Sequence, residues 1–199
     1  MDRALLEWIA GHRTHDLNHL TRAMARLGGN PTALAVLAAV GAVLVARTRA
    51  WRMAAQVGAS MLLALAAAET VKAIVARPRP PLHLLLWADP VPGSAMPSTH
   101  AAWGAAAVAS VAIACPWGDR ARRWTVVVGA VVQVGVGAAM AYLGAHWLSD
   151  VLVGWLLGVL VAVGVDVVAD RIVESRVSRA ARTGSGGRWS PPGRPNRAG

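Results

Sequence analysis

The 199-residue sequence predicts an all-α integral membrane protein, a helix bundle of about five transmembrane helices preceded by an interfacial amphipathic helix. Two observations predict this fold. The mean hydropathy is +0.45, with 55% hydrophobic and only 15% charged residues. The apolar residues also come in blocks, and Ala54–Ala68 and Val151–Val165 contain no charged residue. With their flanks these blocks approach the roughly 20 residues that cross a bilayer, where a backbone must satisfy its own hydrogen bonds and is therefore helical.

The formal net charge is +10, from 20 basic and 10 acidic residues. Most of the arginines fall in short loops and a tail beside apolar spans, so we interpret the excess as a topology signal and expect no nucleic-acid partner. The single cysteine, Cys115, excludes an internal disulfide and a cysteine-based zinc site. This composition excludes an ordinary soluble domain.

Residues 1–30 contain the predicted interfacial amphipathic helix. Apolar side chains recur there at helical spacing, at Leu17, Leu20, Met24 and Leu27. The alternative is a metal site built from the histidines of this segment, His12, His15 and His19. No carboxylate and histidine pattern of a known site accompanies them, so the surface helix is favoured.

The predicted transmembrane core covers residues 31–170. It contains five apolar spans, approximately Pro31–Ala46, Met53–Ala76, Thr99–Cys115, Trp124–Leu143 and Trp147–Val168. Glycines within the spans allow helices to approach closely. Gln133 is expected to form an interhelical hydrogen bond, and a ligand contact is the alternative.

The arginines also predict an orientation. Thirteen of them lie between spans one and two, between spans three and four, and after span five. If these face the cytoplasm, the C terminus is cytoplasmic, and residues 77–98 and the turn near His146 lie on the extracytoplasmic face of the cell membrane. Residues 171–199 are expected to form a disordered basic tail, because the chain is rich in Gly, Ser, Pro and Arg from Ala180 onward.

Three polar clusters interrupt the apolar chain, all at predicted outer ends of spans. The first contains Lys72, near the end of span two, and Arg79, beyond the helix stop at Pro78. Two cations separated by a helix stop can converge on one anion, and snorkelling is the alternative for the lysine. Glu69 lies one turn before Lys72 and is expected to pair with it, with proton shuttling as the alternative.

The second cluster, residues 96–100, immediately precedes span three. Proline is preorganised for a first helical turn, so the N–H groups of Ser98 and Thr99 can bind an anion at the positive end of the helix dipole. His100, one turn in, can donate a proton to a group bound there. Ordinary helix caps and an interfacial histidine are the alternative.

The third cluster is His146 and Asp150, four residues apart and therefore on one face of a helix. A carboxylate at this spacing can accept the imidazole N–H, fix its tautomer and raise the basicity of the other nitrogen. This is the base and orienter arrangement of nucleophilic catalysis, and a structural pair is the alternative.

Together the clusters resemble the membrane-bound type 2 phosphatidic acid phosphatase family over roughly residues 1–170. The family signature is Lys-x6-Arg-Pro, then Pro-Ser-Gly-His, then Ser-Arg-x5-His-x3-Asp. The matching positions are Lys72, Arg79, Pro80, Pro97, Ser98, His100, His146 and Asp150. Thr99 replaces the glycine, and Ala139 and Met140 occupy the Ser-Arg positions.

The resemblance implies a phosphatase that needs no metal or cofactor and hydrolyses a lipid phosphate or polyprenyl diphosphate through a phosphohistidine intermediate. It makes His146 the nucleophile, Asp150 its orienter and His100 the proton donor to the leaving oxygen. The groups that it assigns to the phosphoryl oxygens are Lys72, Arg79, Ser98 and the backbone N–H of Thr99. Cations and helix N–H groups can supply the electrostatic stabilisation that phosphoryl transfer requires.

Met140 departs from the signature, since loss of a phosphate-clamping donor costs about 10² to 10³ in rate. Arg77 is the expected substitute, because Pro78 keeps its segment out of regular helix; an interfacial anchor is its alternative role. Two other functions stay open. One is a phosphotransferase, and the other is a catalytically weak relative that binds lipid phosphate head groups or scaffolds a membrane complex.

Overall fold

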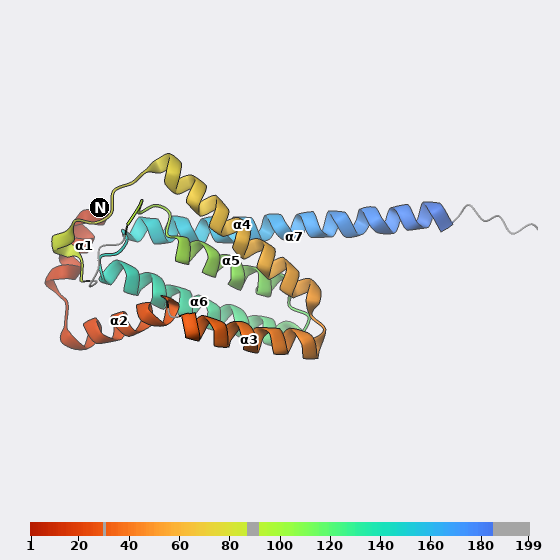
Figure 1. Cartoon of the computed structure of the whole chain (residues 1–199), viewed down its shortest axis with the longest axis horizontal. Helices are drawn as coiled ribbons and strands as arrows, with labels where there is room; N and C mark the ends of the chain where they lie inside the picture. Colours follow the sequence, from red (N-terminus) through yellow and green to blue (C-terminus); the bar gives the residue numbers. More distant parts are fainter. Residues whose placement is uncertain (30, 87–91, 185–199) are drawn as a thin grey trace, which may run out of the picture. The chain divides into compact units, whose positions relative to one another are not determined.

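The computed structural model describes the backbone of residues 1–29, 31–86 and 92–184, and the side chains within those ranges except 26–38, 40 and 181–184. Its elements are α1 (Asp2–Gly11), α2 (His15–Gly29), α3 (Pro31–Thr48), α4 (Trp51–Val75), the short 3₁₀ helix η1 (Leu82–Leu84), α5 (Thr99–Ala114), α6 (Asp119–Tyr142) and α7 (Leu148–Gly184) (Figure 1). The predicted all-α fold is confirmed. The chain divides into two compact units, residues 1–166 and 167–199.

The N-terminal segment folds as two helices, α1 and α2, and the prediction of a single helix in residues 1–30 is wrong. Between the two helices, the Arg13 guanidinium donates to the backbone carbonyls of Tyr142 (2.7 Å) and Leu84 (2.8 Å). The second helix packs against α6 and is thus part of the bundle. Hydrophobic periodicity cannot reveal this break, because a long-range contact of the arginine accompanies it.

The helices α3, α4 and α5 lie close to the bounds predicted for spans one to three. The fourth span begins earlier than predicted, at Asp119. The preceding residue, Gly118, has a φ of 84°, and Asp119 places a negative charge at the N-terminus of α6, where the helix dipole favours it. Among the described residues, α4, α6 and Leu148–Ala180 of α7 are long and apolar enough to cross a bilayer, whereas α5 has 16 residues.

Small residues form the core of the first unit, where α5 packs against both α4 and α6. The fully buried alanines are Ala64, Ala68, Ala95, Ala102 and Ala106. Large apolar side chains are exposed instead, among them Leu62 (68%), Val131 (68%) and Leu160 (59%). Lipid covers such side chains in a membrane, and small residues let the helix backbones approach. The distribution of residue sizes therefore agrees with a multi-pass membrane protein.

Two glutamines lie at contacts between helices. Gln133 of α6 packs against Gly104 of α5, where an added Cβ would lie 2.2 Å from Nε2 of the glutamine. No described group bonds to Gln133 Oε1. An interhelical hydrogen bond is made by Gln56 of α4, whose Nε2 donates to Oδ1 of Asp166 in α7 (2.9 Å).

In the second unit, residues 167–184 are helical. The disorder expected for residues 171–199 is therefore wrong for 171–184, and the rest of that expectation lies outside the described residues. No glycine or proline occurs between Gly164 and Gly184, and the strong helix formers Ala and Arg are frequent there. These propensities outweigh the basic composition from which disorder was expected.

The start of α7 lies close to α5, which gives a test of the packing. A Cβ added at Gly158 would lie 2.1 Å from the backbone oxygen of Ala102, whereas one at Gly164 would meet nothing within 4 Å. We expect Gly158→Ala to destabilise the protein by about 1 to 3 kcal/mol through overpacking, and Gly164→Ala to be neutral or slightly stabilising. Thermal melting of both variants in detergent measures the difference, and equal melting temperatures would contradict the packing.

Candidate active site

A cavity of about 490 Å³ lies where the end of α4, the start of α5, the end of α6 and the turn before α7 meet α2. Its lining residues are Ala25, Glu69, Lys72, Arg79, Pro92, Thr99, His100, Met140, Ala145 and His146. Five of these were predicted as site residues: Lys72, Arg79, Thr99, His100 and His146. The three clusters, far apart in sequence, therefore contribute to one cavity.

Lys72 stands in the last turn of α4 with its side chain only 16% exposed. Its Nζ donates to Glu69 Oε1 (3.0 Å) and to the Thr99 hydroxyl, which in turn donates to the same glutamate oxygen (2.8 Å). The predicted pairing of Glu69 with Lys72 is confirmed. The threonine at the family's glycine position is the third member of this group, so it ties the ammonium to the start of α5.

Arg79 follows the end of α4, where Ala76 adopts a left-handed conformation (φ 46°). Its Nη1 donates to the Ala145 carbonyl (2.8 Å) and lies 3.4 Å from Nε2 of His146. Burial lowers the pKa of the Arg79 guanidinium, and the charge of Asp150 partly offsets this. An arginine keeps its charge under such a shift, so a cation stands directly beside the imidazole.

The ring of His146 has a defined tautomer. Its Nδ1 lies 2.9 Å from the backbone oxygen of Ala95. A carbonyl oxygen can only accept, so Nδ1 carries the proton and Nε2 of the neutral ring carries a lone pair. That lone pair is on the side of Arg79 and the cavity, where a nucleophile is required.

Asp150 does not accept the imidazole proton in the way that the sequence predicts. Its Oδ2 lies 3.6 Å from Nδ1 of His146 and accepts the backbone N–H of Trp147 (2.9 Å). The helical-face argument fails because α7 begins at Leu148, which leaves His146 in the preceding turn. The fully buried carboxylate remains close enough to act on the imidazole by its charge.

Ser98 is placed differently from its predicted role. The residue is 1% exposed, and its backbone N–H donates to the carbonyl oxygen of Asp150 (2.9 Å). That N–H is thus already used in joining the start of α5 to α7, and Ser98 is absent from the cavity lining. This N–H is therefore not available to a bound anion, because a buried donor finds its partner within the protein, and the role of Ser98 in substrate binding stays a prediction.

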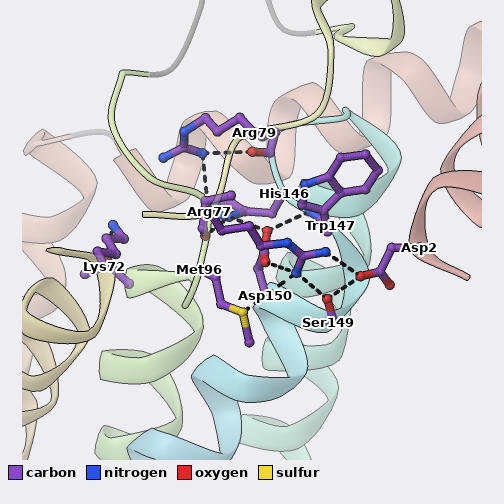
Figure 2. A network of polar contacts seen from close by, with 12 residues as sticks. Asp2, Lys72, Arg77, Arg79, Met96, His146, Trp147, Ser149 and Asp150 are labelled. Atoms are coloured by element: carbon purple, nitrogen blue, oxygen red, sulfur yellow. Dashed lines mark hydrogen bonds and ion pairs between the residues drawn. The ribbon is translucent and has the colours of Figure 1, made fainter. Parts of the chain in front are cut away.

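The expectation that Arg77 substitutes for the arginine missing at position 140 is not met. Arg77 Nη1 donates to Asp150 Oδ1 (2.6 Å) and Ser149 Oγ (2.6 Å), and its Nη2 donates to Asp2 Oδ2 (2.8 Å) (Figure 2). Arg77 is not among the residues that line the cavity. The guanidinium therefore faces Asp150 from the side of α1 and does not replace the missing phosphate clamp.

Sequence reasoning missed Asp2 and the Ala95 carbonyl. A backbone acceptor has no sequence signal, and Asp2 lies in a segment that the hydrophobic pattern assigns to a surface helix. Met140, at the position of the expected arginine, does line the cavity. Within the described ranges, no three His, Cys, Asp or Glu side chains are grouped as a metal site.

Known proteins share this architecture. A PAP2 type phosphatidylglycerolphosphate phosphatase from Bacillus subtilis superposes with a TM-score of 0.68, covering 86% of this chain and 85% of its own, at 23% identity. LpxE from Aquifex aeolicus gives a TM-score of 0.62, covering 81% of this chain and 92% of its own, at 19% identity.

A curated relative, the undecaprenyl-diphosphatase of Sulfolobus acidocaldarius, is 30% identical over 105 residues, which are 50% of this chain and 47% of that protein. The chain thus spans about half the length of this relative. The model of the PAP2 superfamily matches residues 53–172, a range that contains all three polar clusters. By this match over more than half of its length, the chain belongs to the PAP2 superfamily.

Proposed function

We propose that this protein is a membrane phosphatase that hydrolyses a lipid phosphate or polyprenyl diphosphate. The observation that carries the proposal is the lone pair of His146 Nε2, which lies beside Arg79 in a cavity also lined by Lys72. A nucleophile and two cations are what a phosphoryl group needs for covalent transfer.

In the proposed reaction, His146 Nε2 attacks the phosphorus and the bond to the leaving oxygen breaks. Lys72 and Arg79 bind the phosphoryl oxygens, and His100, which lines the same cavity, donates a proton to the leaving oxygen. Water then attacks the phosphohistidine and gives up a proton to His100, which releases phosphate and restores both rings. This mechanism requires no metal ion.

A lipid substrate is supported by where the cavity lies. Residues near the ends of α4 and α6 line it, and both helices are long and apolar enough to cross a bilayer. A phosphate bound there leaves its hydrocarbon chain among lipids. Two similar proteins are described as acting on phosphatidylglycerolphosphate and undecaprenyl diphosphate, which are both lipids with terminal phosphate.

Met140 favours a second candidate function, a weak phosphatase or a binder of lipid phosphate head groups. Its thioether lines the cavity where the signature has arginine, and Arg77 points elsewhere. The cations of the cavity lining are then Lys72 and Arg79, and the ammonium is already paired with Glu69.

The covalent step gives the first prediction for this site. We expect His146→Ala to lower kcat by at least about 10³ and to abolish a labelled phosphoenzyme trapped by acid quench. His83→Ala, which alters an exposed histidine of η1 outside the cavity, is the matched control. Retention of turnover or of the phosphoenzyme in His146→Ala would remove the nucleophile assignment.

The cavity lining gives a prediction for Met140. We expect Met140→Arg to raise kcat/KM by about tenfold or more, because a third cation would bind the phosphoryl oxygens. Met140→Leu retains an apolar side chain and serves as the control. If Met140→Arg brings no gain to an active parent, the present cations suffice and the weak-phosphatase alternative is wrong.

We also propose that the cavity faces the extracytoplasmic side and that the C terminus is cytoplasmic, as the arginine distribution predicts. In a Cys115→Ala background, His83→Cys and Ser178→Cys place single thiols at exposed positions of η1 and α7. An impermeant thiol reagent added to intact cells should label the first and spare the second. The reverse pattern would invert the topology.

A further inference from the structure

One guanidinium joins the first residue of α1 to the carboxylate beside His146. Arg77 uses two different nitrogens, Nη1 for Asp150 (2.6 Å) and Nη2 for Asp2 (2.8 Å), so it is held between two carboxylates (Figure 2). The Ser149 hydroxyl donates to Asp2 and accepts from Arg77. The contact therefore involves three segments: α1, the chain after α4, and the first turn of α7.

The aromatic ring of Trp147 restrains the same guanidinium. Arg77 Cζ lies 5.6 Å from the ring centroid, and Trp147 Nε1 donates to the Pro78 carbonyl (3.0 Å). Cation–π contact and a hydrogen bond to the neighbouring residue thus limit the directions in which Arg77 can point. The guanidinium of Arg77 is therefore held in the orientation in which it contacts Asp150.

The charges in this contact differ in exposure. Asp150 is fully buried, while the side chains of Arg77 and Asp2 are 26% and 24% exposed. Burial acts to raise the pKa of Asp2, but hydrogen bonds from Ser149 and Arg77, together with the charge of Arg77, outweigh it and lower the pKa. Asp2 is therefore ionised at neutral pH and draws Arg77 by charge as well as by hydrogen bonding.

A buried carboxylate without a cation is costly, and Arg77 is the cation that Asp150 contacts directly. Arg77 donates to Oδ1 of Asp150, which leaves Oδ2 to accept the Trp147 N–H. In this position Oδ2 lies 3.6 Å from Nδ1 of His146. Moving Arg77 would free the carboxylate to rotate and to change its distance from the imidazole.

We infer that Asp2 and Arg77 are positioning residues for the proposed phosphatase reaction: Asp2 holds Arg77, and Arg77 holds Asp150 at a fixed place beside His146. The inference rests on the proposed function. Neither residue lines the cavity, so neither touches the phosphoryl group. When Nε2 is phosphorylated the imidazole becomes cationic, and a fixed Asp150 stabilises that charge without rearrangement.

Asp2→Asn tests this inference, because it keeps the size of the side chain and removes its charge. We expect kcat to fall about tenfold while KM stays within about twofold, as for loss of a group that orients another. Asp16→Asn, at an exposed acidic position in the first turn of α2, is the matched control and should leave both parameters unchanged. A kcat for Asp2→Asn equal to that of an active parent overturns the inference and leaves the phosphatase proposal intact.

A double-mutant cycle separates positioning from a local structural effect. If Asp2 acts through Arg77, Asp2→Asn should lower kcat by less than about twofold in an Arg77→Gln background. Independent, multiplicative losses would contradict the inferred chain of contacts. Melting temperatures identify variants that fail to fold. If Arg77→Gln does not fold, the kinetics of Asp2→Asn alone test the inference.

A second measurement needs no turnover. The rate at which diethyl pyrocarbonate modifies His146, read by mass spectrometry, should rise at least about threefold in Asp2→Asn, because the His146 side chain is 7% exposed in the parent and would be less firmly held in the variant. An unchanged rate overturns the inference. A parent that releases no phosphate would refute the proposed function, and this rate would still decide the positioning role.

Discussion

The buried charge of Asp150 constrains everything around the cavity, because a carboxylate shielded from water must be compensated by the protein. Its side chain accepts from Arg77 and from the Trp147 N–H, and its backbone oxygen accepts from Ser98. These bonds tie the segment after α4 and the start of α5 to the first turn of α7. The position of His146 follows from the same junction, since its Nδ1 faces both the Ala95 carbonyl oxygen (2.9 Å) and the carboxylate of Asp150 (3.6 Å).

Such a junction requires helices that approach closely. Gly154 provides this at the start of α7, where an added Cβ would lie 2.6 Å from the Ser98 oxygen, and Gly158 repeats it one turn later against Ala102. The bundle can use small residues in its core because lipid, and not the core, covers its Leu and Val side chains. The small residues of the core, which suit a protein surrounded by lipid, therefore also bring the three polar clusters together.

The two departures from the family signature have different physical consequences. Thr99 connects Lys72 to Glu69 through its hydroxyl, so it adds a hydrogen bond to the ammonium where glycine would add none. Met140 instead presents an apolar side chain to the cavity. Charge stabilisation of a bound phosphoryl group would then depend mainly on Arg79, which is not paired with a carboxylate in the cavity lining and stands beside His146.

The sequence by itself determined the helical membrane fold, the approximate bounds of α3, α4 and α5, and the Glu69–Lys72 pair, because hydrophobic blocks and one-turn spacings are local properties. It also determined which residue types could act on phosphate. Only the tertiary structure decided that Arg77 turns toward Asp2 and Asp150, that Ser98 is buried, and that the Ala95 carbonyl orients His146. These partners lie far apart in the chain, and a long flexible side chain or a backbone carbonyl finds its partner only after the helices have packed.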